Sequence, residues 1–97
     1  MSANSNENAR NLALDVLIRI EKDDSYSNLA IDGALKEAPS LSNADKAFFT
    51  ALVYGTVERK ITLDYNLGLY LKEPLKKLNP VVLCALRLGA YQILFME

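Results

Sequence analysis

A lysine-rich segment in the second half of the chain has the clearest chemical character. Residues 71–80 include Lys72, Lys76 and Lys77 and end at Asn79-Pro80, where a helix is expected to begin. The free N–H groups and the dipole at a helix N-terminus attract phosphate, as lysine side chains do. This segment is therefore the best candidate for binding the phosphates of a nucleic acid.

Four more basic residues join this candidate set: Arg10, Lys46, Arg59 and Lys60. Arg59 and Lys60 follow the third expected helix and could extend the lysine patch. In an alternative interpretation, lysines beside prolines are solvated surface, and Arg59 and Lys60 complement the dipole at a helix C-terminus. The five tyrosines could stack on bases, although their helical spacing is more typical of half-buried core.

The charge of the chain is distributed unevenly along its 97 residues. The net charge is −1, which argues against a protein coated with basic charge. Residues 1–58 carry five basic and nine acidic side chains, whereas residues 59–97 carry six basic and three acidic ones. An anionic partner is therefore expected at the second half.

Most kinds of catalytic site are excluded by composition. The chain has no histidine and one cysteine, Cys84, which excludes His/Cys zinc sites and the common nucleophile systems. Cys84 lies in an apolar segment without a nearby base, so it is interpreted as a small core residue. The four glycines are isolated, and no phosphate-cradling loop is present. The sequence predicts no catalytic residue, no metal and no cofactor.

A second group of residues is expected to be structural. Arg87 is the only charge between Pro80 and Met96, and it either binds phosphate in a cleft or is buried and paired to Asp45 or Asp64. Gly55 lies in the middle of an apolar helical face, which predicts that another backbone passes close to it. Gly89 is also assigned a structural role.

Helical periodicity predicts an all-α fold of about five helices, with no strand pattern. The expected helices run from Ala9 to Asp23, from Ser27 or Asn28 as cap to before Pro39, from a Ser42 cap to about Arg59, from Ile61 to Leu71, and from Pro80 to the end of the chain. The expected buried face of the first helix contains Leu12, Ala13, Val16, Leu17 and Ile20, with Leu14 and Ile18 as a second apolar edge. That of the third contains Ala44, Ala47, Phe48, Ala51, Leu52 and Gly55.

The length predicts one domain at residues 9–97, preceded by a frayed or disordered segment at residues 1–8. The polar N-terminus and the lone thiol predict a cytoplasmic protein. The apolar run 81–96 is shorter than the roughly 20 residues that a membrane span needs and contains Arg87, so no membrane contact is expected. This apolar helix has no polar end, which suggests a domain truncated at its C-terminus and a homodimer that covers its exposed apolar surface.

Three segments read together resemble a known family. They are Asp24-Ser25-Tyr26-Ser27-Asn28-Leu29-Ala30, the stretch from Asp45-Lys46-Ala47-Phe48-Phe49 through Leu52-Val53-Tyr54-Gly55-Thr56-Val57 to Thr62-Leu63-Asp64-Tyr65, and Leu86-Arg87-Leu88-Gly89-Ala90-Tyr91-Gln92-Ile93-Leu94-Phe95. The pattern resembles the N-terminal NusB-like domain of the small-subunit ribosomal RNA cytosine-C5 methyltransferases (RsmB, Sun or Fmu).

This resemblance implies a NusB-like, non-catalytic helical bundle that binds ribosomal RNA. The seven basic residues above are the expected RNA contacts. It also implies a partner, the S-adenosylmethionine-dependent catalytic domain of the same protein, and further helices beyond Glu97. Free-standing NusB-type antitermination factors are the nearest alternative, although they typically have an arginine-rich N-terminus and this chain has only Arg10 before Arg19. A third hypothesis is a helical domain that docks on its own catalytic domain and has little RNA affinity.

Overall fold

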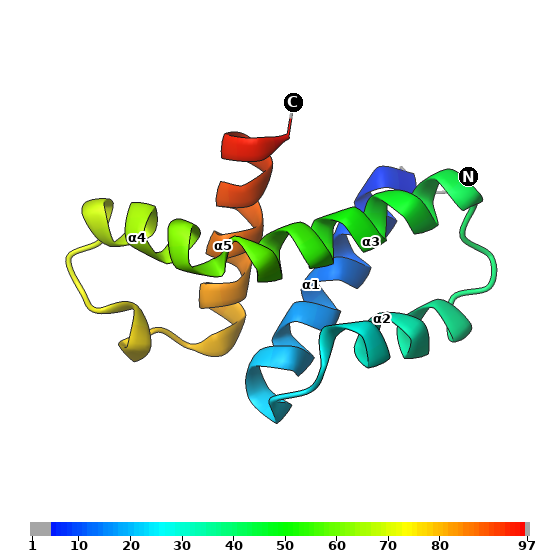
Figure 1. The fold of residues 1–97 in the computed structure, drawn as a ribbon, viewed down its shortest axis with the longest axis horizontal. Coiled ribbons are helices and arrows are strands. Elements are labelled where there is room, and N and C mark those ends of the chain that lie inside the picture. Colours follow the sequence, from blue (N-terminus) through cyan, green and yellow to red (C-terminus); the bar gives the residue numbers. More distant parts are fainter. Residues whose placement is uncertain (1–4, 97) are drawn as a thin grey trace.

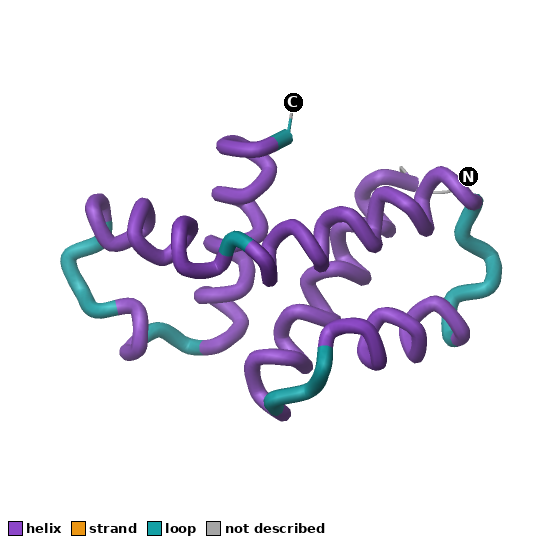
Figure 2. Tube along the Cα trace, viewed as in Figure 1, coloured by secondary structure: helices purple, strands orange, loops and turns teal. Residues whose placement is uncertain are grey.

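The computed structural model describes residues 5–96, and in that range it contains helices and loops but no strand (Figures 1 and 2). The elements are α1 (Ser5–Asp23), α2 (Ser27–Lys36), α3 (Asn43–Glu58), α4 (Lys60–Tyr70), a short 3₁₀ turn (Leu75–Lys77) and α5 (Pro80–Phe95). The expected all-α class and the break between α3 and α4 at Arg59 are confirmed.

The first helix begins earlier than its apolar pattern indicates. It starts at Ser5, so residues 5–8 continue the helix instead of forming the expected frayed segment. Residues 1–4, the rest of that segment, lie outside the described residues. The C-terminal end falls where expected, at Asp23, and Asp24 turns the chain with a positive φ of 55°.

Two of the three expected helix caps are present. The Ser42 hydroxyl accepts a hydrogen bond from the Asp45 N–H at 3.1 Å, and the Asn79 side-chain oxygen accepts one from the Val81 N–H at 2.7 Å. Such bonds satisfy backbone donors that have no partner inside the helix. The prediction for α2 was wrong, because its N-cap position is Tyr26, which makes no side-chain capping bond.

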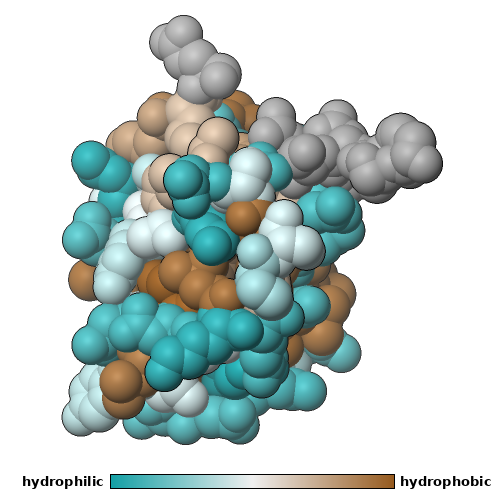
Figure 3. All heavy atoms as spheres, turned by 90° about the vertical axis from the view of Figure 1, so that its right-hand side faces the viewer, coloured by the Kyte–Doolittle hydropathy of each residue, from teal (hydrophilic) through white to brown (hydrophobic). Residues whose placement is uncertain are grey.

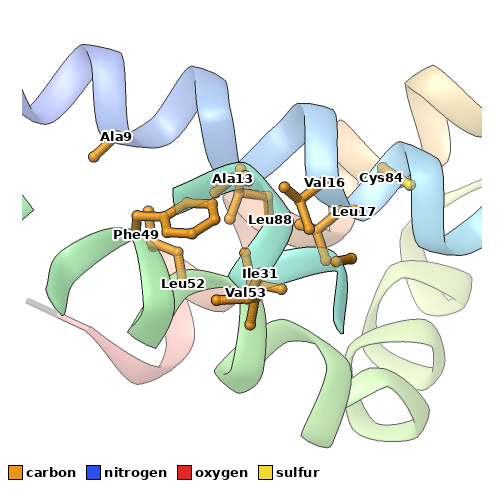
Figure 4. Close-up of a cluster of buried hydrophobic side chains, with 12 residues drawn as sticks. Ala9, Ala13, Val16, Leu17, Ile31, Phe49, Leu52, Val53, Cys84 and Leu88 are labelled. Atoms are coloured by element: carbon orange, nitrogen blue, oxygen red, sulfur yellow. The ribbon is translucent and has the colours of Figure 1, made fainter. Parts of the chain in front are cut away.

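Helix α1 is the centre of the bundle. It packs against α3, α5 and α2, whereas α4 lies at one end of the molecule and contacts mainly α5 (Figure 1). Apolar side chains of α1 meet those of α3 in the core, joined by Ile31 of α2 and by Cys84 and Leu88 of α5 (Figure 4). The expected face of α1 is confirmed, since Ala13, Val16 and Leu17 are buried there.

Helix α3 presents a different face from the predicted one. Its buried residues are Asp45, Phe49, Leu52, Val53 and Thr56. Ala44, Ala47 and Ala51 are exposed, and Phe48 is only half-buried. Adjacent residues of a helix are about 100° apart, and apolar residues occur on most sides of α3, so the pattern allowed two faces. The face that is buried includes the polar residues Asp45 and Thr56, so it did not read as an apolar face in the sequence.

Gly55 makes room for a side chain, and not for the passing backbone that its position in the helix predicted. A Cβ built at Gly55 would overlap the outer end of the Tyr91 ring of α5. Gly55 therefore admits this ring between α3 and α5. At Gly89, in contrast, an added Cβ would meet no atom within 4 Å, so packing among the described residues gives it no structural role.

Gly55→Ala should lower the free energy of unfolding by about 1–3 kcal/mol, although alanine favours a helix by about 1 kcal/mol, because the Tyr91 ring must move. In a Tyr91→Ala background the space is open, and the same change should stabilise the domain. Urea unfolding of the four proteins measures both effects. Equal costs in the two backgrounds would contradict the contact.

Most of the large exposed apolar side chains lie on α4 and α5. Leu14 and Ile18, expected as a second apolar edge of α1, are half-buried against the core. The largely exposed residues include Ile61, Tyr65, Leu69 and Tyr70 of α4 and Ile93 and Leu94 of α5. A groove of about 290 Å³ lies between these two helices. The face at the other end of the molecule is mostly hydrophilic, with an apolar strip across its middle (Figure 3).

Candidate nucleic-acid interface

The seven basic residues predicted to contact RNA do not form one patch. Arg10 lies on α1, Lys46 in the first turn of α3, Arg59 between α3 and α4, and Lys60 at the start of α4. The three lysines of the loop lie before α5, at the opposite end of that helix from Phe95, which contacts Arg59. A helix of 16 residues is about 24 Å long, so the loop lysines at the start of α5 are separate from Arg59 at its end.

Arg10 joins three helices at one edge of the bundle. Its Nε donates a hydrogen bond to the side-chain oxygen of Gln92 at 2.7 Å, which ties α1 to α5. Its guanidinium carbon lies 5.4 Å from the centre of the Phe48 ring, within the range of a cation–π contact. Arg10 is thus an exposed cation held over an aromatic ring.

Arg59 makes a second and closer contact of this kind. Its guanidinium carbon lies 4.2 Å from the centre of the Phe95 ring. Phe95 in turn stacks on Tyr91, with ring centres 5.7 Å apart and planes inclined by 28°. Arg59, Phe95 and Tyr91 therefore form a row of contacts in which Phe95 touches both of the others, and we call it the Arg59 stack. The charge pattern of the sequence pointed to Arg59 but not to its aromatic neighbours.

Lys60 points to a different partner from its neighbour Arg59. Its Nζ lies 3.9 Å from a carboxylate oxygen of Glu21, and its side chain is half exposed. An ion pair as long and as exposed as this contributes little to stability. It nevertheless gives Lys60 an acidic neighbour, so Lys60 is a weaker candidate for phosphate contact than Arg59.

The loop lysines are exposed, as expected, but the helix N-terminus beside them offers few free donors. Lys76 and Lys77 lie in the 3₁₀ turn and point no charge into the core. Pro80 has no N–H, and the N–H groups of Val81 and Leu83 both donate to Asn79. The expected contribution of these amides to anion binding is therefore largely lost, and the lysine ammonium groups remain.

Arg87 is a buried structural cation. Its Nε and Nη2 donate to the two carboxylate oxygens of Asp64 at 2.7 and 2.9 Å, and its Nη1 donates to Glu21 at 2.9 Å. Burial alone lowers the pKa of Arg87, but these hydrogen bonds and charges outweigh it and leave the pKa above its ordinary value. The prediction of a buried, paired arginine is confirmed with Asp64 as the partner. Glu21 was not foreseen.

Next to Arg87 is a cavity of about 60 Å³, larger than the roughly 10–15 Å³ that one water occupies. Its wall includes Cys84 and Thr56, whose buried hydroxyl has no hydrogen-bond partner among the described residues. Burial raises the pKa of the Cys84 thiol, and the Glu21 charge raises it further. The neutral thiol is thus favoured, in agreement with its interpretation as a core residue.

No helix in the described part of the chain is long and apolar enough to cross a membrane. Within the same part, no group of three or more His, Cys, Asp or Glu side chains is arranged to hold a metal ion.

The structure thus defines an all-α bundle with two separate groups of mostly exposed basic side chains. Residues 7–97 match the NusB family, and the chain belongs to this family. It is 40% identical over 88 residues to the Bacillus subtilis protein named "Probable ribosomal RNA small subunit methyltransferase B", covering 91% of this chain and 19% of that protein. A Synechocystis protein of the same name is 40% identical over 89 residues, which cover 92% of this chain and 20% of the relative.

The transcription antitermination protein NusB of Ralstonia pickettii is 35% identical over 63 residues, which cover 65% of this chain and 41% of that protein. The chain thus spans about a fifth of the length of the methyltransferase relatives. No solved structure gave a significant match.

Proposed function

We propose that this NusB-family domain binds small-subunit ribosomal RNA and positions it for an S-adenosylmethionine-dependent cytosine-C5 methyltransferase domain of the same protein. The observation that carries the proposal is the extent of the match. The similarity to the two proteins named methyltransferase B extends over nine-tenths of this chain. The similarity to the Ralstonia antitermination protein covers a smaller part.

In this proposal the chain itself supplies no catalytic residue and no cofactor site. Its chemistry is that of ammonium and guanidinium groups, which bind phosphates and fix the register of an RNA without reading its sequence. We place this work in the cytoplasm, in keeping with the lone thiol of Cys84. The catalytic-domain partner and the homodimer stay predictions. The apolar surface open to them is on α4 and α5, and not on the second edge of α1.

A charge reversal in the loop tests the RNA contact. Lys76→Glu with Lys77→Glu should weaken binding of a small-subunit ribosomal RNA fragment by about tenfold or more, because two phosphate contacts become repulsions. The salt dependence should fall by about 0.7 in log–log slope for each lost contact to a single strand. Fluorescence anisotropy at several salt concentrations measures both quantities.

The matched control is Lys22→Glu with Lys36→Glu, which changes the charge equally on α1 and α2. This control should bind nearly as well as the unaltered domain. Equal losses in the two double variants would show a general charge effect and not a site. A preference for a transcript leader RNA over ribosomal RNA would instead support the antitermination alternative, and no binding to either would support the docking domain.

A further inference from the structure

The Arg59 stack has a geometry that phosphate binding alone does not explain. A cation that only neutralises phosphate needs no aromatic ring behind it. Arg59 instead lies over the face of Phe95, which is itself stacked on Tyr91. Arg59 and Phe95 are both exposed, so this row ends in a charged group at the surface.

The row is held in place by contacts on both helices. Tyr91 occupies the space that Gly55 leaves open, which fixes the ring between α3 and α5. The backbone N–H of Arg59 donates to the carbonyl of Gly55 at 3.1 Å. The backbone of Arg59 is therefore anchored one helical turn after Gly55, the residue that makes room for the Tyr91 ring. A surface ordered in advance loses little entropy when a ligand binds to it.

Arg59 takes part in no ion pair within residues 5–96. The ion pairs recorded among the described residues involve Lys60 and Arg87. The contact described for its guanidinium is the ring of Phe95, and the exposed remainder of that group can meet a ligand through its face and its N–H edge. A planar ligand that carries negative charge nearby would satisfy both.

An unpaired RNA nucleotide has this chemistry. Its base offers a π-face that stacks on arginine or aromatic groups regardless of sequence, and its phosphate accepts hydrogen bonds from guanidinium. Bases in a duplex are already stacked on their neighbours and cannot reach such a surface. The second arginine on a ring, Arg10 over Phe48, is connected to the same helix through Gln92, one residue after Tyr91.

We propose that the Arg59 stack is a docking site for an unpaired base of single-stranded RNA. The inference rests on the proposed RNA-binding function and adds the form of RNA that is recognised. It makes Phe95 and Tyr91, which carry no charge, part of the RNA interface, and it assigns the loop lysines to phosphates elsewhere along the strand.

Two substitutions separate stacking from charge. Phe95→Leu keeps an apolar side chain but removes the π-face, and Arg59→Lys keeps the charge but removes the planar group. Each should weaken binding of a single-stranded oligonucleotide containing 2-aminopurine by about tenfold and abolish the quenching of its fluorescence by stacking. Affinity for a duplex RNA of the same length should change less than twofold. Circular dichroism confirms that the variants are folded.

Arg19→Lys on α1 and Tyr70→Leu on α4 are the matched controls, and both should leave binding and quenching unchanged. Single-strand affinity and quenching that survive Phe95→Leu and Arg59→Lys would overturn the stacking site while leaving the proposed function intact. Equal losses for single strand and duplex would also overturn it, because they indicate a charge or folding effect. If the unaltered domain bound neither form, the proposed function itself would fail, and this inference with it.

Discussion

Replacing Phe49 with alanine should lower the free energy of unfolding by about 3–5 kcal/mol. The Phe49 side chain is fully buried and lies between α1 and α3, close to Ala13 (Figure 4). Its removal loses the transfer free energy of the ring and leaves a cavity that the surrounding helices can fill only in part. A domain of this size has a total stability of roughly 5–15 kcal/mol, so the loss is a large fraction. Urea unfolding followed by circular dichroism measures it.

The adjacent Phe48 provides the control, since it is the same residue type one position away on the same helix. Phe48 is half-buried, and one of its contacts is with the exposed Arg10. Phe48→Ala should therefore cost only about 1 kcal/mol. The opposite order of the two losses would mean that α3 presents its alanine-rich face to the core, as the sequence pattern alone suggested.

Asp64→Ala should be nearly as damaging and should lower the free energy of unfolding by about 3 kcal/mol. It leaves the guanidinium of Arg87, which is buried, with Glu21 alone of the two carboxylates that it contacts within residues 5–96. A buried charge that loses its bidentate partner is costly, because the remaining contact offsets less of the desolvation of the charge. Glu21→Ala removes one hydrogen bond where Asp64→Ala removes two, so it should cost less.

A double variant distinguishes this cause from simple loss of packing. Asp64→Ala combined with Arg87→Met removes the buried charge together with its partner, and it should be more stable than Asp64→Ala alone. Chemical unfolding of the two single variants and the double variant gives the coupling free energy. A double variant that loses the sum of both single effects would show that Arg87 and Asp64 act independently.

Several features of this protein could be derived from its sequence because they are set by neighbouring residues. Apolar side chains three and four positions apart are typical of a helix with one buried face. This spacing predicted the positions of all five α-helices. The Ser42 and Asn79 caps satisfy backbone donors three and two residues further along the chain. The burial and pairing of Arg87 could also be predicted from its position among apolar residues, because a buried charge is costly unless it is paired.

Other features depended on contacts between segments far apart in the chain. The buried face of α3 was decided by which side α1 covers, since its apolar residues permitted two orientations. The reason for Gly55 was a ring 36 positions later, and Glu21 reaches Arg87 across 66 positions. Likewise, charge counting grouped Arg59 with the loop lysines, whereas the length of α5 separates them and its last turn places Phe95 against Arg59. Local patterns carry no information about such distances, because the packing of whole helices determines them.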